Sequence, residues 1–121
     1  MHVQFAELPV RDQARAKRFY VENLGCEIAA DAPMGSDGWR WVELRFAGSQ
    51  TTLHLIRAKE EGVSDGSVLV LVDDDVAGAV EGLRSRGVEI LTEPHSPPWQ
   101  RGRTVAEFRD SEGNRMVIGS L

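Results

Sequence analysis

The sequence has few of the features that mark secreted, membrane-spanning or nucleic-acid-binding proteins. Cys26 is the single cysteine of 121 residues, so the chain can form neither an intramolecular disulfide nor a thiolate metal site, which fits a reducing cytoplasm. The longest apolar run, 68–72, is far shorter than the roughly 20 residues of a membrane helix. The first residues lack the basic start and apolar stretch of a secretion signal. We therefore expect a soluble cytoplasmic protein that makes no use of a membrane.

An excess of positive charge is missing as well. The chain has 14 Lys and Arg against 19 Asp and Glu, which gives a formal charge of −5. Without a cluster of Lys and Arg it lacks the electrostatic footprint of nucleic-acid-binding proteins, so we expect no nucleic-acid partner. The 41% hydrophobic and 27% charged fractions are those of a globular protein, and the length suits one domain with one modest cavity.

The two halves of the chain share a pattern at a separation of 62 residues. The segment 8–12 corresponds to 70–74, and Gly25 corresponds to Gly87. Phe46 corresponds in the same way to Phe108. Several matches in one register predict a duplicated unit of about half the chain.

Each half has the pattern of a strand, a helix and three further strands. In the first half we predict a helix that begins after Asp12 and ends at Gly25. In the second half the helix begins after Asp74 or Asp75 and ends at Gly87. Pro33 is expected in a turn and His95 in a proline-rich loop. The predicted strands are 3–10, 26–30, 39–46, 51–57, 68–72, 88–92, 103–108 and 115–119.

The motifs at both ends of the chain resemble one protein family. Leu8-x-Val10-x-Asp12, followed by Phe19-Tyr20 and Leu24-Gly25, resembles the opening of the vicinal oxygen chelate superfamily. That superfamily includes glyoxalase I, extradiol dioxygenases and the fosfomycin- and bleomycin-resistance proteins. Near the other end, Phe108-x-Asp110-x-x-Gly113-Asn114 is similar to the family's turn before its last strand, and Pro98-Trp99 followed by Arg103 resembles the preceding loop.

The resemblance implies an α+β fold in which two βαβββ modules form a mixed sheet curved around a cup. It implies one domain over 1–121, with module 1 at about 1–58, a linker at about 59–66 and module 2 at about 67–121. It also implies a homodimer, with the modules pairing either within one chain or across two chains.

The resemblance further implies four metal-ligand positions, on the first and fourth strands of each module. In this sequence they are Phe5, His54, Ser67 and Val117. A transition-metal site needs about three or four N or O donors, and only His54 is a firm one. We therefore expect no metal cofactor. The alternative is a divalent metal in a relocated site built from Glu7, Glu43 or Glu107.

Strand alternation indicates which side chains face the cup. His54 lies between two leucines and points away from them, so it is a candidate general base, with Glu7 to orient its ring. The plainer alternatives are a half-buried histidine with satisfied hydrogen bonds and an ordinary edge carboxylate. The other candidate ligand-binding residues are Phe5, Trp39, Trp41, Glu43, Ser67, Trp99, Arg115 and Val117.

Some of these candidates have structural alternatives of their own. The indoles of Trp39 and Trp41 could stack on a planar or cationic ligand, or fill the cup or a dimer seam. Trp99 could be a lid or a plug at the end of the sheet. Arg115 could pair with a ligand carboxylate or a cup glutamate, or be a surface cation. The run 73–75 of three aspartates is more simply a helix cap than a metal site.

The preferred function is metal-independent binding or sequestration of a small aromatic or cationic organic molecule, similar to the bleomycin-resistance branch. The alternative is a glyoxalase- or dioxygenase-like lyase, isomerase or oxidoreductase with a reduced or relocated metal site. A third reading is a scaffold or regulatory module whose cup is filled by its own side chains.

Overall fold

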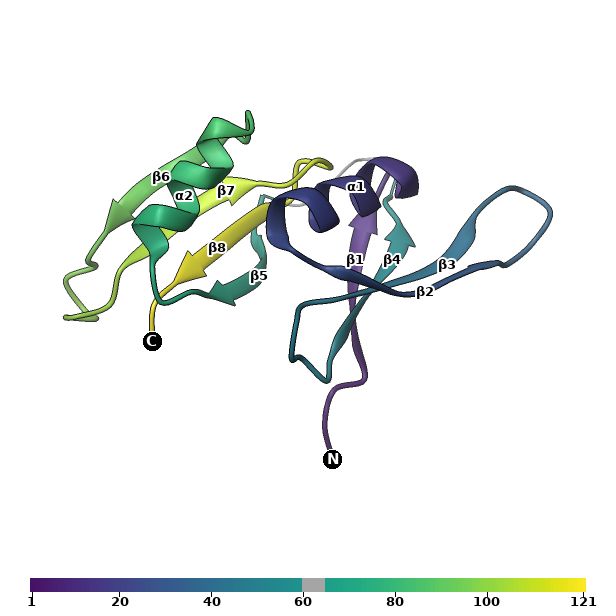
Figure 1. Ribbon diagram of the computed structural model, residues 1–121, viewed down its shortest axis with the longest axis horizontal. Coiled ribbons are helices and arrows are strands. Elements are labelled where there is room, and N and C mark those ends of the chain that lie inside the picture. The colour runs from purple at the N-terminus through teal and green to yellow at the C-terminus, as the bar shows by residue number, and fades with distance from the viewer. Residues whose placement is uncertain (60–64) are drawn as a thin grey trace. The chain divides into compact units, whose positions relative to one another are not determined.

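The computed structural model describes residues 1–59 and 65–121, which belong to two compact units, Met1–Val63 and Ser64–Leu121 (Figure 1). Most of the linker predicted at about 59–66 lies outside the described residues. Neither helix in the described part of the chain is long and apolar enough to cross a membrane.

The first unit is a βαβββ module. Its four strands form one mixed sheet in the order β1-β4-β3-β2, in which β1 and β4 are parallel and the other neighbours are antiparallel. Its elements are β1 Phe5–Val10, α1 Gln13–Leu24, β2 Glu27–Pro33, β3 Arg40–Arg45 and β4 Thr52–Arg57.

The second unit repeats this topology with the order β5-β8-β7-β6, and β5 and β8 are its parallel pair. Its elements are β5 Ser67–Val72, α2 Val76–Ser85, β6 Ile90–His95, β7 Val105–Arg109 and β8 Arg115–Gly119. Two four-stranded mixed sheets with one helix each confirm the predicted α+β class and the duplicated βαβββ plan.

The helices begin at aspartate caps, as the sequence predicts. The Asp12 carboxylate accepts a hydrogen bond from the backbone N–H of Arg15, 3.0 Å away. Of the two candidates for the second helix, Asp75 is the cap, because its carboxylate accepts from the N–H of Gly78 at 2.9 Å. Gly25 ends α1 in the left-handed region at φ 71°, which a residue without a Cβ adopts at little cost.

One face of each sheet packs against the helix of its own unit and forms the core. Strand alternation sends every second side chain to this face. In the first unit the buried hydrophobic side chains are Leu8, Val10, Ala16, Tyr20, Cys26, Val42, Leu44, Leu53 and Leu55, and in the second they are Val76, Val80, Leu83, Ala106, Phe108, Met116 and Ile118. The intervening side chains point to the opposite face, which we call the distal face of each sheet.

The predicted correspondence of Phe46 with Phe108 is wrong. Leu44 of β3 pairs with Leu53 of β4, and Phe108 of β7 pairs with Met116 of β8. Leu44 is therefore the counterpart of Phe108, and Phe46 lies beyond the end of β3. The separation at this strand is 64 residues rather than 62, because the connections before it differ in length between the units.

Two prolines lie in strands where turns or loops were predicted. Pro33 ends β2, and Pro94 and His95 belong to β6. Both strands are at the edge of their sheet, where proline is tolerated because one side of the strand has no ladder partner. Proline is therefore compatible with an edge strand in this protein, at the end of β2 and inside β6.

Candidate functional site

His54 is at the centre of the distal face of the first sheet. Its register partners are Glu7 on β1 and Glu43 on β3, so a carboxylate side chain lies on each side of it. Only 8% of the His54 surface is exposed. The sheet register thus brings together three of the residues that the sequence singled out, from three different strands.

Three rings form a cluster on this face. The His54 ring stacks on Trp41, with centroids 3.9 Å apart and an interplanar angle of 27°. Phe5 meets His54 edge-on at 5.2 Å and Trp41 edge-on at 6.0 Å. Such offset and edge-to-face contacts are favourable ring arrangements. The cluster places aromatic surface beside the two carboxylates.

One polar atom in the cluster is unsatisfied. His54 Nδ1 lies 3.3 Å from Glu7 Oε2, but it is buried and makes no hydrogen bond to any described residue. Burying a polar atom without a partner is unfavourable by about 1–3 kcal/mol, so such an atom calls for an explanation. The Glu7 side chain is 55% exposed and remains accessible to solvent.

Glu43 is held as a carboxylate by its neighbours. Its Oε1 accepts a hydrogen bond from the Thr52 hydroxyl at 2.6 Å, and its Oε2 accepts from the Trp41 indole N–H at 2.8 Å. These two bonds lower the pKa of Glu43, and the nearby His54 and Arg45 lower it further. The distal face of the first sheet therefore carries a fixed negative charge.

In the second unit Val117 has the position that His54 has in the first. It pairs with Val70 on β5 and with Glu107 on β7, as His54 pairs with Glu7 and Glu43. A pocket of about 430 Å³ lies on this face. It is lined by Val70, Thr92, His95, Pro97, Trp99, Gln100, Arg103, Val105, Glu107 and Val117.

Arg115 is engaged by two acidic residues of its own unit. Its Nη1 donates to Glu107 Oε2 at 2.6 Å, and its Nε and Nη2 donate to the backbone oxygen and the carboxylate of Asp65. Hydrogen bonds from Arg109 and Arg115 lower the pKa of Asp65. Of the roles considered for Arg115, the structure shows the pairing with a glutamate of the distal face.

The remaining candidates lie apart from the ring cluster. Trp39 precedes β3, and the Arg57 guanidinium lies over its ring, 4.4 Å from the ring centroid. Arg57 is three residues after His54 on β4 and so points to the opposite face of the sheet. Trp39 therefore does not share the face of Trp41. Trp99 is 80% exposed in the loop after β6, and Ser67 is exposed at the start of β5. The convergence of Phe5, His54, Ser67 and Val117 on one cup involves both units and stays a prediction.

The donors at the four expected positions do not fit a divalent metal. Phe5 and Val117 have no donor atom, and no group of three or more His, Cys, Asp and Glu is gathered within residues 1–59 and 65–121. Two of the three relocated-site candidates are already bonded: Glu43 to Trp41 and Thr52, and Glu107 to Thr92 and Arg115.

Sequence reasoning missed Thr52 and Asp65. Thr52 is two residues before His54 on β4, so strand alternation alone puts it on the distal face, where its hydroxyl holds Glu43. Asp65 lies ahead of β5 in the segment predicted as a linker, and no local pattern connects it to Arg109 and Arg115.

Known proteins are similar to this chain in sequence and fold. Residues 2–118 match the model of the Glyoxalase/Bleomycin resistance protein/Dioxygenase superfamily. The uncharacterized protein YetH of Bacillus subtilis (strain 168) is 35% identical over 111 residues, which cover 90% of this chain and 89% of YetH.

Solved structures that cover nearly the whole chain include two with more than a quarter of their residues identical to it. TnmS3, described as an antibiotic binding protein from Streptomyces sp. CB03234, is 33% identical with a TM-score of 0.82, over 99% of this chain and 95% of TnmS3. A superfamily member from Sphaerobacter thermophilus DSM 20745 is 28% identical with a TM-score of 0.86, over 100% of this chain and 98% of the other. The chain described here belongs to the glyoxalase, bleomycin resistance protein and dioxygenase superfamily.

Proposed function

We propose that the protein binds a small, flat aromatic or cationic organic molecule on the distal face of its first sheet, and that it does so without a metal. The observation that carries the proposal is the cluster of Phe5, Trp41 and His54 set between Glu7 and Glu43. Aromatic surface next to carboxylates favours flat molecules with positive charge, through stacking and Coulomb attraction.

Glu7 supports a polar contact with the ligand. His54 Nδ1 lies 3.3 Å from Glu7 Oε2 but is itself buried, whereas the Glu7 side chain is 55% exposed. A carboxylate accepts hydrogen bonds, so Glu7 can bind an N–H or O–H group of a ligand that lies on the rings. This contact would fix the orientation of the ligand.

The similarity to TnmS3 supports binding rather than turnover, because that protein is described as an antibiotic binding protein. The donor chemistry supports independence from metal, because the expected ligand positions include Phe5 and Val117. In the second unit, the pocket beside Trp99 offers a further aromatic surface of the same kind. Sequestration is the activity that these features support best.

The test is a fluorescence titration with ethidium, a flat aromatic cation, beside fluorescein, a flat anion. We expect saturable binding of ethidium only, weakened about tenfold by Trp41→Leu and about fivefold by Glu7→Gln, through lost stacking and lost charge. Trp39→Leu and Glu22→Gln are the matched controls, because both residues lie away from the ring cluster. Equal binding of the two dyes, or equal losses in the controls, would contradict the proposal.

The competing function is a metal-dependent lyase or dioxygenase. Elemental analysis of protein purified without chelator separates the two functions. We expect less than stoichiometric transition metal and no change in ethidium binding after treatment with EDTA. One tightly held metal ion per chain, or loss of binding with EDTA, overturns metal independence.

A further inference from the structure

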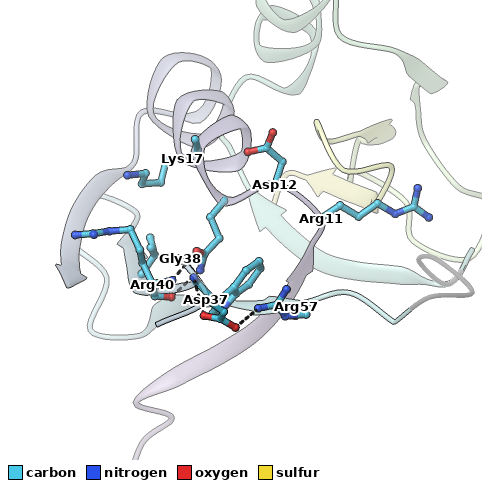
Figure 2. A pocket seen from close by; sticks show the side chains of 11 residues that line it. Arg11, Asp12, Lys17, Asp37, Gly38, Arg40 and Arg57 are labelled. Atoms are coloured by element: carbon cyan, nitrogen blue, oxygen red, sulfur yellow. Dashed lines mark hydrogen bonds and ion pairs between the residues drawn. The ribbon is translucent and has the colours of Figure 1, made fainter. Parts of the chain in front are cut away.

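The first unit has a pocket of its own, away from the ring cluster. It lies where the start of α1, the segment 34–39 and the end of β4 meet (Figure 2). Its volume is about 410 Å³, which is in the range of small-molecule sites. It is lined by Arg11, Asp12, Gln13, Ala14, Lys17, Asp37, Gly38, Trp39, Arg40, Val42 and Arg57. None of these residues except Trp39 was assigned to the site described above.

Arg57 and Trp39 form one wall of this pocket. The guanidinium lies over the indole at 4.4 Å from the ring centroid, which is within the range of a cation–π contact. Its Nη2 donates to Asp37 at 3.0 Å, and Figure 2 shows this ion pair as a dashed line. Both side chains of the pair are more than half exposed, so the bond is weak and a competing anion can replace it.

Basic side chains outnumber acidic ones around the pocket. Four of the lining residues are cationic, against the two carboxylates of Asp12 and Asp37. Lys17 and Arg40 share Asp31 as their partner, so two of these cations are held by one carboxylate. In a chain with a net charge of −5, such a pocket is a local region of positive potential.

The base of the pocket is held in place before any ligand arrives. The Gln13 amide accepts from the backbone N–H of Arg40 at 2.9 Å and donates to its carbonyl oxygen at 2.7 Å. Gln13 itself is only 9% exposed. This pair of hydrogen bonds joins α1 to β3 and fixes the spacing of the pocket walls. A preformed site binds without the entropic cost of ordering its side chains.

We propose that this pocket is a binding site for a small organic carboxylate with a flat apolar body. The carboxylate takes the place of the Asp37 carboxylate on Arg57, where planar guanidinium and carboxylate groups can form two parallel hydrogen bonds. The apolar body lies against Trp39. Arg57 and His54 are three residues apart on β4 and alternate between its faces, so this site is separate from the ring cluster.

The test follows the indole resonances of the protein in NMR spectra during titration with sodium benzoate, with benzamide and inorganic phosphate as comparison probes. We expect benzoate to shift the Trp39 indole signal in a saturable way and to leave the Trp41 signal unchanged. Benzamide lacks the charge and phosphate lacks the flat body, so each should bind at least about fivefold more weakly.

Three variants define the site. Arg57→Gln should weaken benzoate binding about tenfold, whereas Asp37→Asn should strengthen it about threefold by removing the competing charge. Asn at position 37 can still accept from the N–H of Trp39, as Asp37 does. Arg45→Gln is the matched control, because Arg45 is outside the pocket and beside Glu27.

The results separate this site from the proposed function. Trp41→Leu should leave benzoate binding intact even though it weakens ethidium binding. The inference is overturned if benzoate does not saturate, if benzamide or phosphate binds as tightly, or if Arg45→Gln weakens binding as much as Arg57→Gln.

Discussion

The imidazole of His54 is stacked on the indole of Trp41, with ring centroids 3.9 Å apart, and its buried Nδ1 makes no hydrogen bond to a described residue. The ring is therefore well packed but poorly satisfied as a polar group. These two properties make opposite contributions to stability, and they can be separated by mutation.

Replacing His54 by Phe should preserve or raise stability. A phenyl ring keeps the stack on Trp41 and removes the unsatisfied nitrogen, which is worth up to about 1 kcal/mol. His54→Ala is the comparison, because it leaves a cavity and should lose about 2–3 kcal/mol. Urea unfolding of both variants measures the difference, and equal destabilisation by Phe and Ala would contradict this account.

Glu43 should contribute stability at neutral pH that disappears in acid. Its pKa is lowered in the folded protein by the hydrogen bonds from Thr52 and Trp41, so the contribution is complete above the pKa of the unfolded chain, about 4.3. It is lost as the pH falls through the lower, folded pKa. We expect the stability gap between the natural protein and Glu43→Gln to shrink between about pH 7 and pH 3. Glu22→Gln should show no such change.

The two interior glycines of α2 should respond differently to alanine. A Cβ at Gly82 meets only the flexible end of Arg86 at 3.4 Å, so Gly82→Ala should raise stability by about 0.5–1 kcal/mol. A Cβ at Gly78 comes within 2.9 Å of the Asp75 carboxyl carbon and displaces the helix cap. Gly78→Ala should therefore bring no gain. Thermal unfolding tests both, and a matching gain from Gly78→Ala would show that the cap contributes nothing.

The thiol of Cys26 should be unreactive in the folded protein. Burial raises its pKa to about 12, so at neutral pH very little thiolate is present. We expect Ellman's reagent to react slowly with native protein and to release one equivalent promptly in denaturant. A prompt reaction of the native protein would mean that the segment around Gly25 opens readily.

Much of the first distal face could be predicted from strand periodicity. Glu7, Trp41, Glu43 and His54 are each two residues from another residue of the same face, and a period of two depends only on backbone geometry. Their mutual distances could not be predicted, because these depend on the register between strands. That register is set by the packing of the leucine and valine side chains against α1.

Trp39 shows where periodicity stops being informative. The sequence placed it beside Trp41, but β3 begins one residue later and Gly38 has a φ of 86°, so the chain enters the strand from another direction. Pro94 is a second case in which the local pattern was misleading. A proline-rich pattern predicts a loop, but Pro94 lies in β6, and an edge strand tolerates proline.

The sequence by itself determined the βαβββ plan of each half, the aspartate and glycine ends of α1, and the identity of the side chains at the expected metal positions. These properties depend on local backbone preferences and on residue chemistry, which need no partner distant in the chain. Only the tertiary structure decided that His54 lies between Glu7 and Glu43, that Arg115 is held by Asp65 and Glu107, and that Arg57 covers Trp39. Each of these contacts joins separate elements, and their distances follow from how the cores pack.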